Sequence, residues 1–317
     1  MGLKTAAAAE GIKKEAGRII KGQDDLLEMM LVCLFSGGHI LIEGVPGLGK
    51  TLSTRVLAAV SGLKFKRIQF TPDMMPSDIT GNNVFDMNEG RFHLRKGPVF
   101  ANLLLADEIN RTPPRTQAAL LEAMEEKSVT IDGSTLPMEQ PFMVLATQNP
   151  IEFEGTYPLP EAQLDRFLIK LNLDYPDEKA ELDMLKNHAG GFNAADVESM
   201  NINPVITKEM LGECKDEISH IRIDDSVMSY ILSIVRATRN SPVLMLGASP
   251  RASVALMTAS RALAAMEDRD YVIPEDIKQL ALPVLRHRVI VSPESEIDGI
   301  SADRALTGIV EGIKVPR

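Results

Sequence analysis

The stretch GVPGLGKT, Gly44–Thr51, decides the fold of this 317-residue chain. It follows the apolar run HILIE (39–43) and precedes the helix-like LSTRVLAAV (52–60), the strand–loop–helix setting of the phosphate-binding pattern G-x-x-x-x-G-K-[ST]. Such glycines let backbone N–H groups curl around phosphate oxygens, and the flanking elements disfavour the alternative of a chance glycine turn. We expect a nucleoside triphosphate to be held by Gly44, Val45, Pro46, Gly47, Leu48, Gly49, Lys50 and Thr51.

Two further apolar runs end in polar residues suited to nucleotide hydrolysis. Asp107 and Glu108 stand at the end of NLLLAD (102–107), and Asn149 follows FMVLAT (142–147). Asp107 would hold Mg²⁺ together with Thr51, and Glu108 would accept or orient the proton of the attacking water. Asn149 could hold that water or the γ-phosphate. The alternatives are a solvated acidic loop and a turn asparagine before proline.

The first half of the chain alternates strand-like runs with helical patterns. The strands are expected at 39–43, 65–70, 102–107, 142–147 and 167–173, and one crossover helix at 113–126 with Thr112 as its cap. Two hairpins, 84–94 and 128–136, interrupt this alternation. The pattern predicts an α/β fold, a P-loop αβα sandwich with a parallel sheet.

Strand signals fade after about residue 175. Residues 226–239 place Val227, Ile231, Ile234 and Val235 on one helical face, and 249–267 opens with a cap-like Ser249 and Pro250 at the first helical position. A mostly helical C-terminal domain is therefore expected to begin between about residues 175 and 205.

Composition excludes several classes of function. The net charge of −10 and the pI of about 5.1 make a nucleic acid an unlikely default partner. Cys33 and Cys214 fit no CxxC spacing and are expected as buried, reduced thiols, and the five histidines show no zinc-site spacing. With no signal peptide and no apolar run long enough to span a bilayer, a cytoplasmic protein is expected.

Two arginines lie far along the chain from the phosphate loop. Arg166 stands in LPEAQLDRF (159–167), where an ion pair with Asp165 or Glu161 would explain it equally well. Arg251 stands in GASPRA (247–252), behind the Ser-Pro cap, and a salt-bridged surface arginine is its alternative. RFHLRKG (91–97) is a compact basic cluster that could touch a substrate or form a solvated turn.

These motifs together resemble the MoxR family of AAA+ ATPases over nearly the whole chain. GVPGLGKT resembles Walker A, Asp107–Glu108 Walker B and Asn149 sensor 1. The resemblance implies an AAA+ core at 1–176, in which the 84–94 hairpin is an insert in the second core helix, and a helical lid domain at 177–317. It also implies that Arg166 is an arginine finger for the adjacent subunit, and that Arg251 is sensor 2, contacting the γ-phosphate of its own chain. Arg111 and Arg115 are further interface candidates.

The function expected from motifs and resemblance is Mg²⁺-dependent ATP hydrolysis by a ring, usually hexameric in AAA+ relatives. The MoxR resemblance implies chaperone-like remodelling of protein clients, including metal cofactor insertion, often with a partner that carries a von Willebrand factor A domain. The absence of an NKxD signature favours ATP over GTP. Two alternatives stay open at this point: a motor that acts on nucleic acid, and an adaptor that binds ATP but hardly hydrolyses it.

Overall fold

The structure is a computed structural model that describes residues 2–45, 47–149, 155–190 and 202–316. Its centre is a five-stranded, all-parallel sheet in the order β2–β5–β8–β1–β9. The strands are β1 (Ile40–Glu43), β2 (Phe65–Gln69), β5 (Leu103–Asp107), β8 (Met143–Gln148) and β9 (Ile169–Asn172). The five expected strands and the parallel sheet are confirmed.

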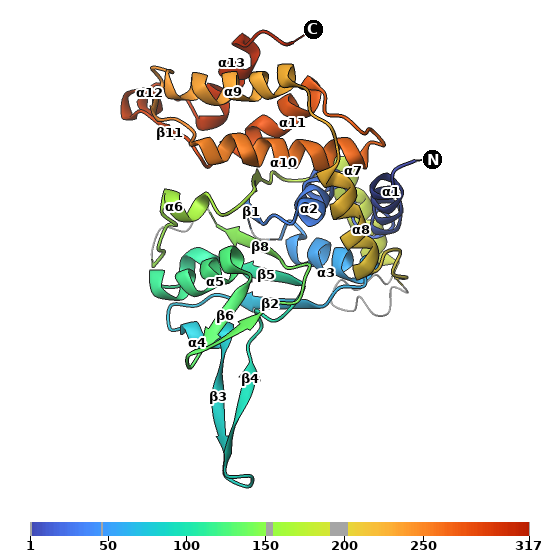
Figure 1. Cartoon of the computed structure of the whole chain (residues 1–317), viewed down its shortest axis with the longest axis vertical. Coiled ribbons are helices and arrows are strands. Elements are labelled where there is room, and N and C mark those ends of the chain that lie inside the picture. The colour runs from blue at the N-terminus through green and yellow to red at the C-terminus, as the bar shows by residue number, and fades with distance from the viewer. Residues whose placement is uncertain (1, 46, 150–154, 191–201, 317) are drawn as a thin grey trace.

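Helices cover both faces of the sheet because alternate strand residues point to opposite sides. Ile40 and Ile42 of β1 belong to one apolar cluster with α2 (Asp24–Ser36) and α3 (Lys50–Val60), whereas Leu41 belongs to a second cluster with α4 (Pro76–Thr80) and α5 (Pro114–Glu126). Figure 1 shows these helices on either side of the strands. The αβα sandwich is confirmed.

The crossover helix α5 begins one residue later than the sequence suggested. Its cap is Pro113, whereas Thr112 ends the short 3₁₀ helix η1 (Ile109–Arg111). Two consecutive prolines explain the difference, because a residue before proline is driven to extended backbone. Thr112 and Pro113 have ψ angles of 151° and 154°. The expected Thr112 cap is therefore wrong.

Two antiparallel hairpins interrupt the sandwich. The long hairpin of β3 (Gly81–Asp86) and β4 (Arg91–Lys96) lies between β2 and β5 in the chain and projects from the body in Figure 1. The short hairpin of β6 (Ser128–Ile131) and β7 (Ser134–Pro137) turns at Asp132 and Gly133, whose φ angles of 47° and 81° suit a two-residue turn. Both expected hairpins are confirmed.

The second half of the described chain is mostly helical. It contains α6 (Glu161–Leu164), α7 (Glu178–Ala189), α8 (Lys208–Ser219), α9 (Asp225–Arg239), α10 (Pro250–Met266), α11 (Pro274–Leu285), α12 (Pro293–Ile297) and α13 (Ala302–Gly312), with a small ladder of β10 (Leu244–Leu246) and β11 (Ile290–Val291). The expected apolar face of α9 is buried, and α10 begins at Pro250 as expected.

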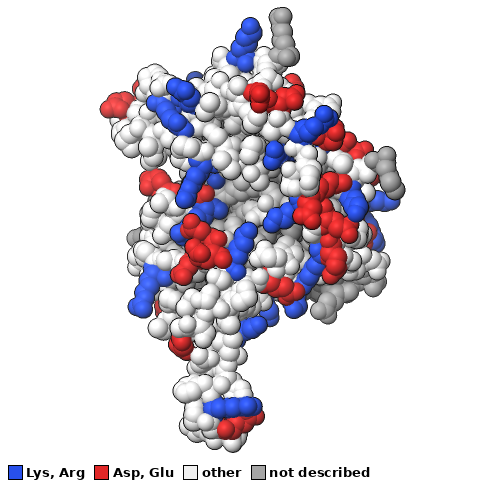
Figure 2. All heavy atoms as spheres, viewed as in Figure 1, with Lys and Arg blue, Asp and Glu red and all other residues white. Residues whose placement is uncertain are grey.

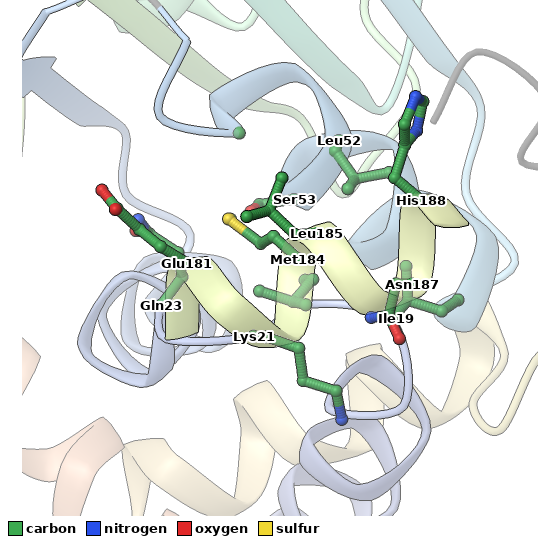
Figure 3. Close-up of a pocket in the computed structure, with 12 residues that line it drawn as sticks. Ile19, Lys21, Gln23, Leu52, Ser53, Glu181, Met184, Leu185, Asn187 and His188 are labelled. Atoms are coloured by element: carbon green, nitrogen blue, oxygen red, sulfur yellow. The ribbon is translucent and has the colours of Figure 1, made fainter. Parts of the chain in front are cut away.

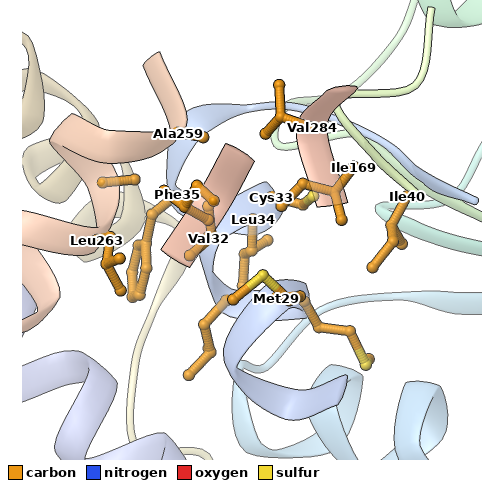
Figure 4. Close-up of a cluster of buried hydrophobic side chains, with 14 of the residues drawn as sticks. Met29, Val32, Cys33, Leu34, Phe35, Ile40, Ile169, Ala259, Leu263 and Val284 are labelled. Carbon is orange, nitrogen blue, oxygen red and sulfur yellow. The ribbon is translucent and has the colours of Figure 1, made fainter. Parts of the chain in front are cut away.

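The N-terminal helices join the sheet to these C-terminal helices. α1 (Lys4–Ala16) and α2 both pack against α10, and one apolar cluster runs from the sheet through α2 into α10 and α11. Figure 4 shows Phe35 of α2 in this cluster with Ala259 and Leu263 of α10. Because the cluster is continuous, the division between residues 176 and 177 stays a prediction.

Two properties outside the architecture complete the description. Cys33 and Cys214 are both buried and free, and burial raises the pKa of each thiol. Among the residues with described coordinates, the helices are all too short or too polar to traverse a lipid bilayer.

Candidate functional site

The carboxyl ends of four parallel strands border one cavity of about 420 Å³. This is the edge at which open α/β sheets bind ligands, because the loops that follow neighbouring strands converge there. The cavity brings together most residues expected from the sequence: Gly44, Gly47, Leu48, Gly49, Lys50, Thr51, Asp107, Glu108 and Asn149. Val45 lies in the same loop, and Pro46 lies outside the described residues.

The loop after β1 has the conformation that a phosphate cradle needs. Gly47 and Gly49 have φ angles of 89° and 76°, and a Cβ built on either would meet no atom within 4 Å. Both glycines therefore leave open space beside the backbone N–H groups at the start of α3, where the helix dipole favours an anion. A triphosphate chain fits this donor set.

Lys50 is the half-buried cation of the cavity. Its Nζ donates a hydrogen bond of 2.6 Å to the carbonyl oxygen of Gly44, so the side chain folds back along its own loop. Burial lowers the pKa of Lys50, and the nearby carboxylates of Asp107 and Glu108 act in the opposite direction.

Thr147 fixes the two acids relative to each other. Its hydroxyl donates to Oδ1 of Asp107 at 2.6 Å and accepts the backbone N–H of Glu108 at 2.9 Å. Glu108 adopts the left-handed region at φ 56°, which is uncommon for a residue with a side chain. Thr147 was not predicted as a site residue, although it ends the expected strand that Asn149 follows.

Two residues of β2 bind the other side of the acidic pair. The Arg67 guanidinium lies 2.6 Å from Oδ2 of Asp107, and the Gln69 side-chain amide donates to Oε2 of Glu108 at 2.6 Å. Arg111 also approaches Oε2 of Glu108 at 3.1 Å. Arg67 and Gln69 were not predicted from the sequence. Their alternation with the apolar Ile68 could have identified them, because it sends both polar side chains to one face of the strand.

The oxygen atoms of Thr51 and Asp107 suit Mg²⁺, which prefers hard oxygen ligands and keeps several waters. Asp107 already accepts hydrogen bonds on both carboxylate oxygens, from Thr147 and from Arg67. Arg67 and a metal ion would therefore compete for the same carboxylate.

Arg166 and Arg251 lie at the opposite ends of the strands from the phosphate loop. Both line a different cavity of about 380 Å³, together with Ser36, Gly37, Gly38 and His39, which precede β1, and with Lys127, Asp165 and Arg288. The phosphate loop follows β1, so the two cavities are separated by that strand, about 13 Å for four residues. Arg251 thus lines this second cavity, and its role as sensor 2 for its own chain stays a prediction.

The ion pair of Arg166 differs from its sequence-based alternative, whereas Arg251 is an exposed arginine near an acid, as its alternative described. Arg166 lies 2.8 Å from Glu125 in the last turn of α5, whereas the alternative was a pair with Asp165 or Glu161. Asp165 pairs instead with Arg288, at 2.7 Å, and lies 3.9 Å from Arg251. The Arg251 side chain is 76% exposed in the first turn of α10.

A third, largely apolar cavity of about 490 Å³ adjoins the phosphate loop. Gly49 and Leu52 line both this cavity and the phosphate cavity. Figure 3 shows Leu52 and Ser53 of α3 facing Met184 and Leu185 of α7. No sequence motif marked this cavity, because its walls come from residues 19–23, α3 and α7, which are far apart in the chain.

The long hairpin is less basic than its sequence suggested. Phe85, Met87 and Phe92 are 50%, 91% and 68% exposed, and the rings of Phe85 and Phe92 lie 5.2 Å apart across the strands. Arg91 is paired with Glu89 at 2.6 Å. Figure 2 shows the projection mostly as uncharged surface with charged side chains at its tip.

Comparisons with known proteins agree with this architecture. The profile of the ATPase family associated with various cellular activities (AAA) matches residues 39–169, and that of the AAA lid domain matches residues 236–309. Chaperone MoxR1 of Mycobacterium tuberculosis is 42% identical over 96% of this chain and 81% of its own length. The protein YeaC of Bacillus subtilis is 49% identical over 94% of this chain and 92% of its own. A crystal structure from Cytophaga hutchinsonii matches with a TM-score of 0.91 and 42% identity, covering 99% of this chain and 97% of that one.

Proposed function

The chain belongs to the MoxR family of AAA+ ATPases, and we propose that it hydrolyses ATP in sites that neighbouring copies complete. One observation carries this proposal. One cavity, at the carboxyl ends of the strands, is lined by Lys50, Thr51, Asp107 and Glu108. Another cavity, at the amino ends of the strands, is lined by Arg166 and Arg251. Each chain would thus have a phosphate site at one end of its strands and arginines at the other end.

The adenosine part of ATP fits the apolar cavity beside the phosphate loop. That cavity shares Gly49 and Leu52 with the phosphate cavity, so a single ligand could occupy both. Its apolar walls suit a purine ring, and polar groups such as Gln23 and Asn187 lie at the same cavity. The triphosphate would then lie along the N–H groups at the start of α3.

The residues of the phosphate cavity supply the chemistry of hydrolysis. Mg²⁺, held by Thr51 and by Asp107, would neutralise charge on the phosphate oxygens. Glu108 would accept the proton of the attacking water, and Asn149 would orient that water. Lys50 and the loop N–H groups would stabilise the negative charge that develops on the outer phosphate.

Arg166 and Arg251 would act on the nucleotide of an adjacent copy. Their cavity also contains Lys127 and Arg288, and only Asp165 among the residues that line it is acidic. A positively charged surface of this kind is complementary to the terminal phosphate of a neighbour. A contact between two different surfaces repeats head to tail and gives a ring when the rotation between copies closes, and the resemblance to AAA+ ATPases favours a ring of six copies.

The assembly would remodel protein clients, consistent with the chaperone named among its relatives. The exposed phenylalanines of the long hairpin offer an apolar contact for such a client. A partner with a von Willebrand factor A domain and the insertion of metal cofactors are further parts of the proposal. The acidic net charge of −10 gives no support to a nucleic acid as the substrate.

Mixtures of inactive variants test the composite site. Arg166→Ala and Glu108→Gln should each abolish turnover alone, and mixing the two should restore part of it. The active sites in the mixture combine intact Glu108 of one chain with intact Arg166 of its neighbour. Lys50→Ala mixed with Glu108→Gln is the matched negative control, because no site in that mixture has both an intact phosphate loop and an intact acid.

Two results would contradict the proposal. One is full turnover by Arg166→Ala alone. The other is the absence of recovery in mixtures that sedimentation shows to contain co-assembled chains.

A further inference from the structure

The turn that follows helix α11, residues 286–288, binds the chain on both sides of Arg166. Arg288 donates hydrogen bonds to Oδ1 and the carbonyl oxygen of Asp165, at 2.7 and 3.3 Å. It also donates to the carbonyl oxygens of Phe167, at 2.7 Å, and Leu168, at 3.1 Å. These acceptors belong to residues 165–168, which we call the finger segment.

A second residue of this turn adds to the same contact. Nε2 of His287 lies 2.9 Å from the carbonyl oxygen of Phe167, which therefore receives two donors from consecutive residues. Burial lowers the pKa of His287 well below its usual value, so the ring is neutral and Nε2 carries the donated proton. The finger segment is thus bound to the turn after α11 at three of its four residues.

Arg288 is a buried cation, with only 4% of its side chain exposed. Its remaining bond, to the carbonyl oxygen of Val284, joins it to the last turn of α11. A buried ion pair is a weak source of stability, because an apolar side chain of similar size is often equally stabilising. What the planar guanidinium provides instead is geometry, since one rigid group fixes several oxygen atoms at once.

The finger segment is also bound to the sheet. The backbone N–H of Leu168 donates 2.8 Å to the carbonyl oxygen of His39, directly before β1. Gly38 packs so tightly here that a Cβ would lie 2.6 Å from the Leu168 side chain. The backbone of Arg166 is therefore held close to a contact with the sheet and to contacts with the turn after α11, while its side chain is 29% exposed beside Glu125.

We propose that Arg288 is a positioning residue for Arg166. It holds the finger segment so that the Arg166 guanidinium meets the nucleotide of the neighbouring copy, and it makes that position depend on α11. This inference rests on the proposed function, in which Arg166 acts across the interface between copies. Arg288 does not itself touch the nucleotide.

Steady-state kinetics of two Arg288 variants test this role. Arg288→Met removes every bond that Arg288 makes to the finger segment, and Arg288→Lys keeps the charge but cannot span the same set of oxygen atoms. We expect kcat to fall about 100-fold for Arg288→Met, as for a reacting group displaced by about 1 Å. The KM for ATP should stay within about twofold, because the phosphate and adenosine cavities are not changed. Arg288→Lys should lie between the wild type and Arg288→Met.

Arg286→Met is the matched control. Arg286 lies two residues away, is also buried, with 12% of its side chain exposed, and has Asp303 of α13 at 3.1 Å. It makes no bond to the finger segment among the described residues. We expect its kcat to stay within about threefold of the wild type. An equal loss in both variants would overturn the proposal, because general destabilisation of α11 would then explain it.

Complementation separates positioning from misfolding. Arg288→Met mixed with Glu108→Gln should regain activity, because the first chain keeps an intact phosphate site and the second supplies a well-placed Arg166. Arg288→Met mixed with Arg166→Ala should stay inactive, since neither chain supplies one. No recovery in co-assembled mixtures with Glu108→Gln would overturn the proposal. If Arg288→Met does not fold, Arg288→Lys in the same mixtures decides the question.

The Arg166→Ala variant separates the two proposals. If Arg166→Ala keeps full turnover, the proposed function itself fails. If Arg166→Ala is inactive while Arg288→Met and Arg288→Lys keep wild-type kcat, only the positioning role is refuted.

Discussion

At the residue scale, Thr147 shows how one neutral side chain can fix two charged ones. It is 1% exposed and bridges Asp107 and the backbone of Glu108. Valine has nearly the same shape but no hydroxyl, so it would leave the Glu108 N–H and one oxygen of Asp107 without this partner.

Thr147→Val should therefore lower both stability and turnover. We expect the free energy of unfolding to fall by about 1–3 kcal/mol, the usual effect of leaving a buried polar group unpaired. Urea unfolding and ATPase rates at saturating Mg²⁺ measure the two effects.

Thr130→Val in the short hairpin is the control. Its hydroxyl lies 3.1 Å from that of Thr135, which is also exposed, and a change within about 0.5 kcal/mol is expected. Equal effects at both sites would refute this reading.

A second residue-scale prediction concerns pH. Burial lowers the pKa of His39 from 6.5 to about 4, and its Nδ1 accepts the N–H of Val144 at 3.0 Å. Between pH 6.5 and 4 the unfolded chain therefore binds a proton that folded His39 does not, so stability is lost as the pH falls through this window. From pH 7.5 to 5 this residue should contribute a loss of about 2 kcal/mol.

Urea unfolding at these two pH values checks the sign and the size. His39→Gln should show a smaller loss on acidification than the wild type, whereas His220→Gln, at an exposed position, should match the wild type. His287, whose pKa burial also lowers, adds to the wild-type loss in the same direction. A His39→Gln loss as large as that of the wild type would contradict the prediction.

At the element scale, the features that could be predicted from the sequence are those set by residues close together in the chain. The loop between β1 and α3 was predictable because glycine, lysine and threonine spacing is itself the requirement for binding phosphate. Asp107 and Asn149 were predictable because parallel strands deliver their carboxyl ends to one edge. Arg67 and Gln69 were missed because a strand does not reveal which neighbour it pairs with until the order β2–β5 is known.

Contacts between distant segments were not predictable. Arg288 and Asp165 are 123 residues apart in the chain, and neither motif nor periodicity links them. The side of the sheet on which α10 places Arg251 depends in the same way on packing against α1 and α2. The expected Thr112 cap failed for a local reason, since two prolines in sequence outweighed a good capping side chain.

The root of the long hairpin gives an element-scale prediction. A Cβ on Gly97 would lie 2.2 Å from the carbonyl oxygen of Ile79 and 2.5 Å from the backbone nitrogen of Gly81. Backbone atoms cannot move away cheaply, so Gly97→Ala should destabilise the protein by about 1–3 kcal/mol. Gly212→Ala, inside α8 with open space around it, should instead stabilise by about 0.5–1 kcal/mol. Thermal unfolding of both variants measures the opposite signs, and a stabilised Gly97→Ala would refute the close approach.

At the scale of the whole molecule, a site completed by a neighbour makes activity depend on concentration. We expect turnover per chain to fall as the protein is diluted below its self-association, because each phosphate cavity then loses the arginines of its neighbour. ATPase rates measured over a concentration series, with sedimentation at the same concentrations, test this. Arg166→Ala should give a low and flat profile. Monomers that keep the full rate per chain would contradict the composite site.

The apolar cluster shared by α2 and α10 has a consequence for how the protein is made. Translation delivers α1 and α2 long before α10, the helix that covers them. Side chains such as Met30 and Phe35, fully buried in the folded molecule, therefore stay exposed to water until α10 has been made. A nascent chain that stalls before α10 would expose this apolar surface to water and to other proteins. We therefore expect newly made protein to depend on chaperones that the folded protein no longer needs.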